Sequence, residues 1–86
     1  MDVIIINEDS PFEVSIDGMA GVIKRALVHY KGEFYVVSEN TALKETLVFP
    51  ASPIGEIKSW NEVGGSRGVT LEEVLADFEQ YLHSYF

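Results

Sequence analysis

Residues 22-VIKRALVHYKGEFYVVSE-39 determine the architecture of this chain. The two arms, Val22–Tyr30 and Glu33–Glu39, are rich in β-branched and aromatic residues, which favour strands. Lys31 and Gly32 separate the arms, and glycine readily adopts the positive φ of a tight turn. The segment therefore predicts a β-hairpin. A two-residue and a three-residue turn both fit it, and a one-residue change of register would exchange the faces of a strand.

Two segments before the hairpin also have strand patterns. Val3–Ile6 is a short β-branched run without alternation, which is typical of a strand covered on both faces. Phe12–Asp17 alternates apolar and polar residues, as a half-buried strand does. Between them, Asn7–Pro11 consists of residues that favour turns. The N-terminal part of the chain is thus predicted to add strands to the hairpin.

The segments after the hairpin mix strand and turn signals. Glu45–Phe49 predicts a strand that Pro50 and Pro53 end, because proline cannot donate a hydrogen bond to a neighbouring strand. Ile54–Trp60 is a weaker strand candidate. Gly64–Gly68 is rich in glycine and predicts a flexible loop.

The C-terminal segment has the clearest helix pattern. Thr70 and Glu73 form a T-x-x-E capping box. The apolar residues that follow share one helical stripe, namely Leu71, Val74, Leu75, Phe78, Leu82 and Tyr85. We therefore expect an α+β domain in which a mostly antiparallel sheet of four to six strands carries one C-terminal helix packed on one face.

The composition is typical of one folded domain. The 86 residues are 47% hydrophobic and 23% charged, as in globular chains, and residues 1–86 are too few for two domains of ordinary size. The absence of cysteine excludes disulfides, thiolate metal ligands and thiol catalysis. No window is long and apolar enough for a membrane helix, and Met1–Asn7 lacks the basic start of a secretion signal. We therefore expect a cytoplasmic protein without a membrane contact.

The net charge of −8 is distributed unevenly along the chain. Residues 1–17 contain five acidic residues and no base, and residues 69–86 contain four acidic residues and no base. All six bases lie between these segments, with the other five acidic residues. This balance argues against direct binding of nucleic acid, which requires clustered Lys and Arg. Two interpretations stay open: the charge only keeps the protein soluble, or the two ends form a negative face that complements a basic partner surface.

The second half of the chain carries a resemblance. The motifs are KETLVFP at 44–50, GEIKSW at 55–60 with Glu62, and the T-x-E-E helix start at Thr70. This arrangement resembles small uncharacterised proteins of tailed bacteriophages, which have an E-T-[ML]-V-F-P strand, a G-x-[IV]-x-x-W-x-E segment and an acidic helix. The matching positions are Glu45, Thr46, Leu47, Val48, Phe49, Pro50, Gly55, Ile57, Trp60, Glu62, Thr70, Glu72 and Glu73. The resemblance implies a phage or prophage context and an accessory role inside the host cell, but no catalytic residue.

The sequence contains weak candidates for chemistry. His29 and His83 lack the spacing of metal ligands, so we expect structural roles for both and no metal site. The loop 64–68 precedes a helix, and such loops can hold anions with backbone N–H groups. The candidate anion-binding residues are Arg67, Gly65 and Gly68, although a plain hinge is favoured because no P-loop motif follows. We expect neither an enzyme nor a cofactor.

A protein–protein contact is the preferred function from the sequence. Its candidate residues combine the acidic helix side with nearby aromatics: Glu72, Glu73, Asp77, Glu79, Tyr81 and Trp60. In this hypothesis a phage accessory protein binds a host or phage protein through its negative face, and one form of it is inhibition of a host nucleic-acid or defence enzyme. The alternative is a structural or assembly homodimer formed by edge strands. A third hypothesis is a minor enzyme or small-ligand binder that uses Arg67 and the glycine loop.

Overall fold

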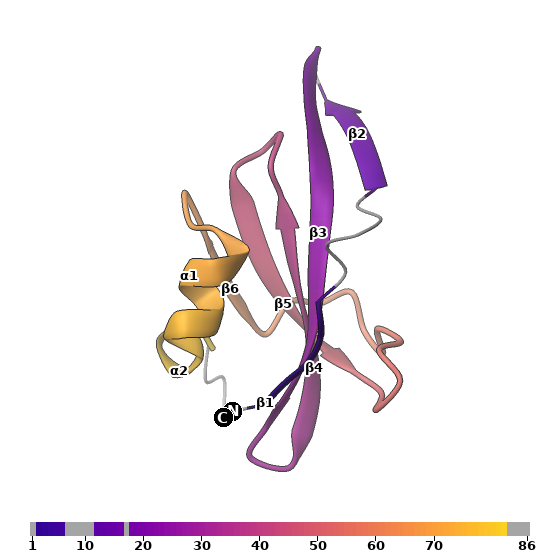
Figure 1. Cartoon of the computed structure of the whole chain (residues 1–86), viewed down its shortest axis with the longest axis vertical. Coiled ribbons are helices and arrows are strands. Elements are labelled where there is room, and N and C mark those ends of the chain that lie inside the picture. The colour runs from indigo at the N-terminus through magenta and orange to yellow at the C-terminus, as the bar shows by residue number, and fades with distance from the viewer. Residues whose placement is uncertain (1, 7–11, 17, 83–86) are drawn as a thin grey trace.

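The computed structural model describes residues 2–6, 12–16 and 18–82 of the chain. It contains a sheet and two short helices (Figure 1), which confirms the expected α+β class and the antiparallel sheet. The turn predicted at Asn7–Pro11 and the helix positions His83 and Tyr85 lie outside the described residues.

The sheet is built from six strands that pair antiparallel throughout. Their bounds are β1 Asp2–Ile6, β2 Phe12–Ile16, β3 Met19–Tyr30, β4 Glu33–Asn40, β5 Glu45–Ala51 and β6 Gly64–Arg67. The order is β1-β3-β4-β5-β6, and β2 also pairs with β3. Because β3 has twelve residues, β1 pairs with its second half and β2 with its first half, as Figure 1 shows.

The central hairpin has a two-residue turn. Tyr30 pairs with Glu33, and the residues between them, Lys31 and Gly32, have φ of 48° and 81°. Positive φ at both positions is the type I′ geometry, which matches the right-handed twist of the strands. This turn settles the register that the sequence left open and thereby assigns every side chain of β3 and β4 to a face.

Alternation along the strands gives the sheet two different faces. We call the first the inner face, because its side chains form one hydrophobic cluster with residues of the C-terminal helices. That cluster contains Ala26, Val28, Val37, Val48, Leu71, Val74 and Phe78. On the opposite, outer face, a smaller cluster contains Leu27, Val36 and Ala51, with Phe34 and Ile57 packed against it. The larger cluster therefore combines side chains of the inner face with three side chains of the C-terminal helices.

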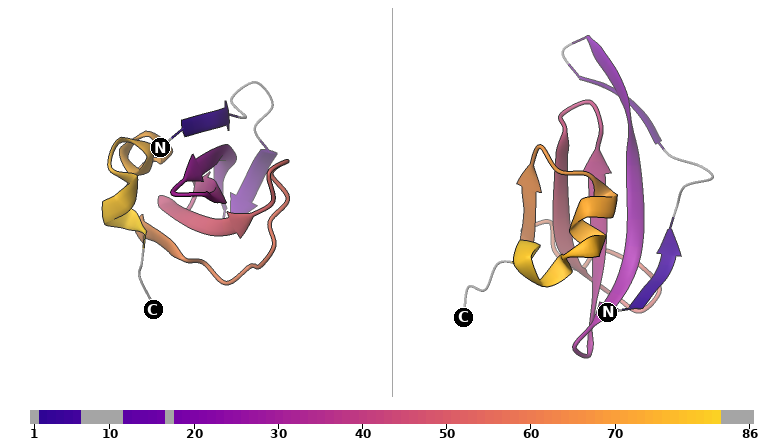
Figure 2. Two further views of the ribbon diagram at one scale, coloured as in Figure 1. Left: turned by 90° about the horizontal axis from the view of Figure 1, so that it is seen from below. Right: turned by 60° about the vertical axis from the view of Figure 1, so that its left-hand side comes forward.

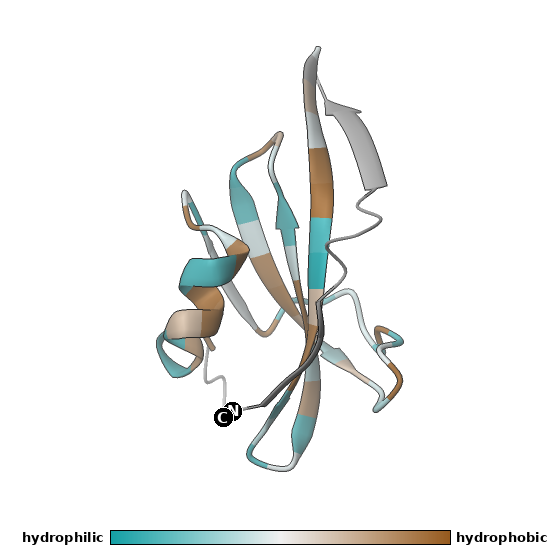
Figure 3. Ribbon diagram, viewed as in Figure 1, coloured by the Kyte–Doolittle hydropathy of each residue, from teal (hydrophilic) through white to brown (hydrophobic). Residues whose placement is uncertain are grey.

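The C-terminal segment forms two short helices, α1 Leu71–Ala76 and α2 Phe78–Tyr81, beside β6 (Figure 2). The Thr70 cap is confirmed, because its Oγ1 accepts a hydrogen bond from the Glu73 N–H at 3.1 Å. In Figure 3, α1 carries both hydrophobic and hydrophilic colours, as an amphipathic helix does. One continuous helix was the wrong expectation, since the chain leaves helical geometry at Asp77 (φ −142°, ψ 56°). Helices this short have little stability of their own, so packing decides their ends.

Two further expectations from the sequence are corrected. Gly64–Arg67 is strand β6 rather than a flexible loop, because glycine lets this backbone lie against that of β5. Ile54–Trp60 is not a strand but part of the loop between β5 and β6, tied to β5 by a single bridge between Ala51 and Ile57. The preceding strand β5 also continues through Pro50 to Ala51.

Two buried polar side chains attach the start of α1 to the sheet. Glu39 is 7% exposed, and its Oε1 accepts a hydrogen bond from the Leu71 N–H at 2.8 Å. Thr46 is fully buried, and its hydroxyl donates to the Val69 carbonyl at 2.7 Å. Both residues lie on the inner face and pair with each other across β4 and β5. They hold the segment that precedes α1 above the core.

Replacing Glu39 by alanine is expected to lower the free energy of unfolding by about 2 kcal/mol, because the buried Leu71 N–H loses its acceptor. Glu39→Gln keeps an acceptor oxygen and should cost about 1 kcal/mol or less. Urea denaturation measures both losses, with Glu62→Ala as an exposed control that should stay within about 0.5 kcal/mol of the parent protein. Equal losses for Glu39→Ala and Glu62→Ala would contradict the anchoring role.

Candidate functional site

An open groove crosses the outer face of the sheet over β3, β4 and β5. It has a volume of about 250 Å³ and is lined by Ile23, Arg25, Ser38, Asn40, Leu43, Glu45, Leu47, Phe49 and Trp60. We call it the outer groove. Its floor follows from the strand register, since Arg25 pairs with Ser38 and Ser38 with Leu47. Side chains alternate along each strand, so these residues point away from inner-face neighbours such as Val37 and Val48.

Trp60 forms one wall of the outer groove and is 67% exposed. Its ring packs against Phe49 in an edge-to-face arrangement, with ring centroids 5.4 Å apart and planes inclined at 65°. The guanidinium carbon of Arg25 lies 5.9 Å from the centroid of the same ring. The loop that carries Trp60 is fixed to β5, because the Lys58 N–H donates to the Pro50 carbonyl at 2.9 Å. A large aromatic side chain is therefore held in one orientation while most of its surface faces solvent.

Hydrogen-bond donors dominate the polar part of the outer groove. The Arg25 Nε donates to the Ser38 Oγ at 3.4 Å, at the long end of hydrogen-bond distances. The Asn40 Oδ1 accepts from the N–H groups of Ala42 and Leu43 at 3.0 and 3.2 Å, and the side-chain NH₂ group of Asn40 has no acceptor among the residues that the structure describes. The Asn40 contacts also fix the turn that presents Leu43.

The two charged residues that line the outer groove have different surroundings. The carboxylate of Glu45 accepts a hydrogen bond from Arg67 Nε at 3.3 Å. Arg25 is half-buried and has no carboxylate within 4.0 Å among the residues that the structure describes. The outer groove can therefore bind an anionic or hydrogen-bond-accepting group beside an apolar one.

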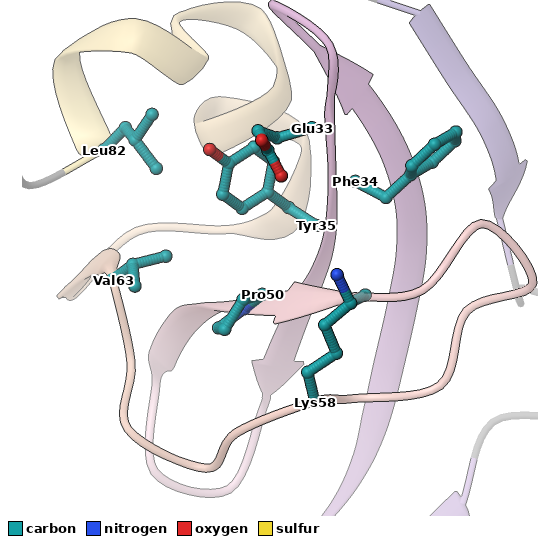
Figure 4. A pocket seen from close by; sticks show the side chains of 8 residues that line it. Glu33, Phe34, Tyr35, Pro50, Lys58, Val63 and Leu82 are labelled. Atoms are coloured by element: carbon teal, nitrogen blue, oxygen red, sulfur yellow. The ribbon is translucent and has the colours of Figure 1, made fainter.

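A second, larger cavity of about 400 Å³ lies at the start of β4 and the end of β5. Figure 4 shows Val63 and Leu82 on one side of this cavity and Lys58 on the other. Partial burial raises the pKa of the Tyr35 phenol, and the neighbouring charge of Glu33 adds to this effect. The phenol therefore stays protonated at neutral pH. The walls are largely apolar, and the exposed charged residues Glu33 and Lys58 stand at the rim.

The structure does not bring the six predicted partner-binding residues together. The exposed acidic residues of the helix segment are Glu72, Glu73, Asp77 and Glu79. Two of these carboxylates have lysine partners, Lys24 at 3.9 Å from Glu72 and Lys31 at 3.4 Å from Glu79. Tyr81 is half-buried and packs against the core cluster, whereas Trp60 belongs to the outer groove. The acidic residues and the exposed tryptophan are thus separate surface features.

The three predicted anion-binding residues have structural contacts. Gly65 lies in β6, opposite Leu47 of β5. The Arg67 side chain pairs with Glu45, although 90% of it is exposed. The Gly68 N–H donates to the Lys44 carbonyl at 2.6 Å. These contacts make the segment an ordered edge of the sheet, and they replace the flexible loop on which the anion hypothesis depended.

Other features of the described chain point to no further site. The His29 ring stacks on Phe34 with centroids 4.5 Å apart and planes inclined at 17°. Within residues 2–6, 12–16 and 18–82, no cluster of three His, Cys, Asp or Glu side chains could hold a metal ion, and no helix is long and apolar enough to cross a membrane. Comparisons with protein-family models, curated proteins and solved structures gave no match.

Of the residues that line the outer groove, sequence reasoning predicted only Trp60 as a contact residue, and it missed the polar side chains of Arg25, Ser38 and Asn40. No motif marks them, because they are neighbours only through the pairing of β3 with β4. Lys31 and Gly32 carried the one usable signal, since a two-residue turn at this point fixes that pairing.

Proposed function

We propose that this chain is a non-catalytic protein-interaction module and that the outer groove is its contact surface. The carrying observation is the orientation of Trp60, which is 67% exposed yet held by Phe49 and Arg25. Tryptophan and arginine are enriched among the residues that dominate binding energy at protein interfaces, and a pre-oriented side chain loses little entropy on binding. We take α1 and α2 to cover the inner face, which leaves the outer groove as the sheet surface for a partner.

The proposal includes the phage or prophage context that the resemblance at residues 44–62 implies. In that context the partner is a host or phage protein, and the contact forms in the host cytoplasm. Leu43, which also lines the outer groove and is 47% exposed, would add apolar contact area. An interface of this kind has an apolar centre and polar neighbours, as Ser38 and Asn40 provide here.

The acidic helix surface supports a second candidate function. Neither helix has a basic residue in its last turn, and Glu72 and Glu73 occupy the first turn of α1. Glu73 and Asp77 have no cationic partner within 4.0 Å in the part of the chain that the structure describes. Such a surface complements a basic partner. One form of this candidate is inhibition of a host nucleic-acid or defence enzyme, with carboxylates in the place of phosphates.

A pull-down from bacterial lysate separates the two candidates. We expect the tagged protein to recover one dominant partner and Trp60→Ala to reduce its recovery at least tenfold, the effect of losing an interface hot spot of roughly 1.4–2 kcal/mol or more. Ile54→Ala is the matched control, because Ile54 is an exposed apolar residue of the same loop but does not line the outer groove. The control should recover the partner as the parent protein does.

A fourfold variant in which Glu72, Glu73, Asp77 and Glu79 become lysine tests the second candidate. Suppose that the partner is no longer recovered by this variant and that moderate salt weakens its recovery by the parent protein, whereas Trp60→Ala still recovers it. The acidic helix surface, and not the outer groove, would then be the contact surface. If the pull-down recovers only further copies of this protein, both candidate functions are rejected and the homodimer is favoured. Circular dichroism of each variant checks that it is folded.

A further inference from the structure

The outer groove has more donors than acceptors among the described residues. The Arg25 guanidinium has five N–H donors, of which Nε contacts Ser38. Ser38 accepts that bond, so its hydroxyl hydrogen stays free to donate. Asn40 uses its carbonyl oxygen on two backbone N–H groups and presents its NH₂. The strand register places these groups together, because Arg25 pairs with Ser38 and Asn40 follows Ser38 by two residues on the same face.

Partial burial distinguishes the charge of Arg25 from the other unpaired cations of the described chain. Lys24, Lys31 and Arg67 each have a carboxylate within 4.0 Å, whereas Arg25, Lys44 and Lys58 have none within the described ranges. Lys44 and Lys58 are exposed, but Arg25 is half-buried. Partial burial of a charge without a partner is unfavourable, so a carboxylate supplied by a ligand would gain from pairing with it. Glu45, the carboxylate that lines the outer groove, accepts a hydrogen bond from Arg67 instead.

The apolar part of the outer groove lies directly beside this cation. Arg25 and Phe49 both contact the Trp60 ring. Leu47 continues the apolar surface, because it pairs with Ser38 across β4 and β5. A ligand that reaches Arg25 with a carboxylate therefore also meets Trp60, Phe49 and Leu47 with its neighbouring group.

We infer that the outer groove recognises a partner-protein segment in which an acidic side chain stands next to an aromatic or large apolar one. The carboxylate pairs with Arg25, assisted by Ser38 and Asn40, and the apolar side chain packs on Trp60. This inference rests on the proposed function, and it adds the chemistry of the partner. It runs against the overall charge of −8, which by itself favours a cationic segment. The ranking of acidic and basic segments is therefore decisive.

Peptide titrations followed by NMR of the ¹⁵N-labelled full chain test the inference. Trp60 is the only tryptophan, so its indole N–H gives one unambiguous signal in the outer groove. The probes are the acetylated and amidated tetrapeptides Gly-Asp-Phe-Gly, Gly-Asn-Phe-Gly and Gly-Lys-Phe-Gly. We expect the aspartate peptide to shift the indole signal and to bind about three- to tenfold more tightly than the asparagine peptide, with the lysine peptide weakest.

Two variants assign the preference to one side chain. Arg25→Gln keeps hydrogen-bond donors but removes the charge, so it should abolish the difference between the aspartate and asparagine peptides. Lys58→Gln is the matched control, because it removes the same charge from a residue that lines the larger cavity and not the outer groove. It should leave the difference unchanged. A heteronuclear spectrum of each variant shows whether the fold is retained.

The outcomes separate this inference from the proposed function. Equal shifts by all three peptides at Trp60 would overturn the acidic preference and leave the outer groove as an apolar contact surface. Tighter binding of the lysine peptide would show that overall charge dominates and would also overturn it. The absence of any shift at millimolar peptide would reject acidic–aromatic recognition, whereas loss of partner recovery in Trp60→Ala would still support the proposed function.

Discussion

Replacing Gly65 by alanine is expected to lower the free energy of unfolding by about 4 kcal/mol, enough to unfold much of a domain of this size. Gly65 has φ of +116°, a conformation that residues with a side chain rarely adopt. A methyl group at this position would also overlap the backbone carbonyl of Thr46 and lie 2.7 Å from the Cα of Leu47. Both neighbours are backbone atoms of β5 and cannot move without breaking the pairing of β5 with β6.

Two other glycines separate the steric from the conformational part of this loss. Gly68 has a positive φ of 76° but open space around it, so Gly68→Ala should cost only about 1 kcal/mol. Gly64 has no positive φ, yet an added methyl would overlap the Tyr81 carbonyl. The loss of unfolding free energy in Gly64→Ala therefore measures crowding alone. Urea denaturation followed by circular dichroism gives all three values. Similar losses for Gly65→Ala and Gly68→Ala would disprove the close approach of β5 and β6.

Replacing Phe78 by alanine is expected to cost about 3–4 kcal/mol of unfolding free energy. Phe78 is 3% exposed, and its ring centroid lies 5.2 Å from that of Tyr30 and 5.5 Å from that of Tyr35. These contacts join α2 to β3 and β4, and a four-residue helix has no stability without them. Their loss should therefore also increase hydrogen exchange at the amides of α1 and α2 more than in the central strands.

Trp60→Ala is the matched aromatic control for Phe78→Ala. Trp60 buries only a third of its side chain, so its removal should cost about 1 kcal/mol or less. Thermal and urea unfolding of both variants give the comparison. A larger loss for Trp60→Ala than for Phe78→Ala would contradict the assignment of Trp60 to a contact surface and of Phe78 to the core.

The parts of the fold that local patterns specify could be predicted from the sequence. The hairpin follows from two strand-forming arms around Gly32, and the start of α1 follows from the Thr70 capping box. The α+β class follows from these elements together. Each of these signals lies within a few consecutive residues, and the local conformation that it favours is the one found in the structure.

The parts that depend on contacts between distant residues could not be predicted. Gly64 and Gly65 form a strand because β5 lies beside them, although glycine is a poor strand former. The break in the helix at Asp77 is not indicated by the helical periodicity, although Phe78 lies on the predicted apolar stripe and packs against Tyr30 and Tyr35. The outer groove is a further case, because Arg25 and Trp60 meet only once the register and the loop are fixed.

The pairing of strands that follow one another in sequence has a consequence for synthesis of the chain. From β3 to β6 every strand pairs with the next one, so the sheet grows from local hairpins whose closure costs little entropy. These hairpins can form while the ribosome is still adding residues. Until residues 71–78 emerge, however, Val28, Val37 and Val48 lack the helices that share their cluster. The nascent chain is thus expected to pass through an aggregation-prone stage that chaperones recognise, and docking of the helices ends it.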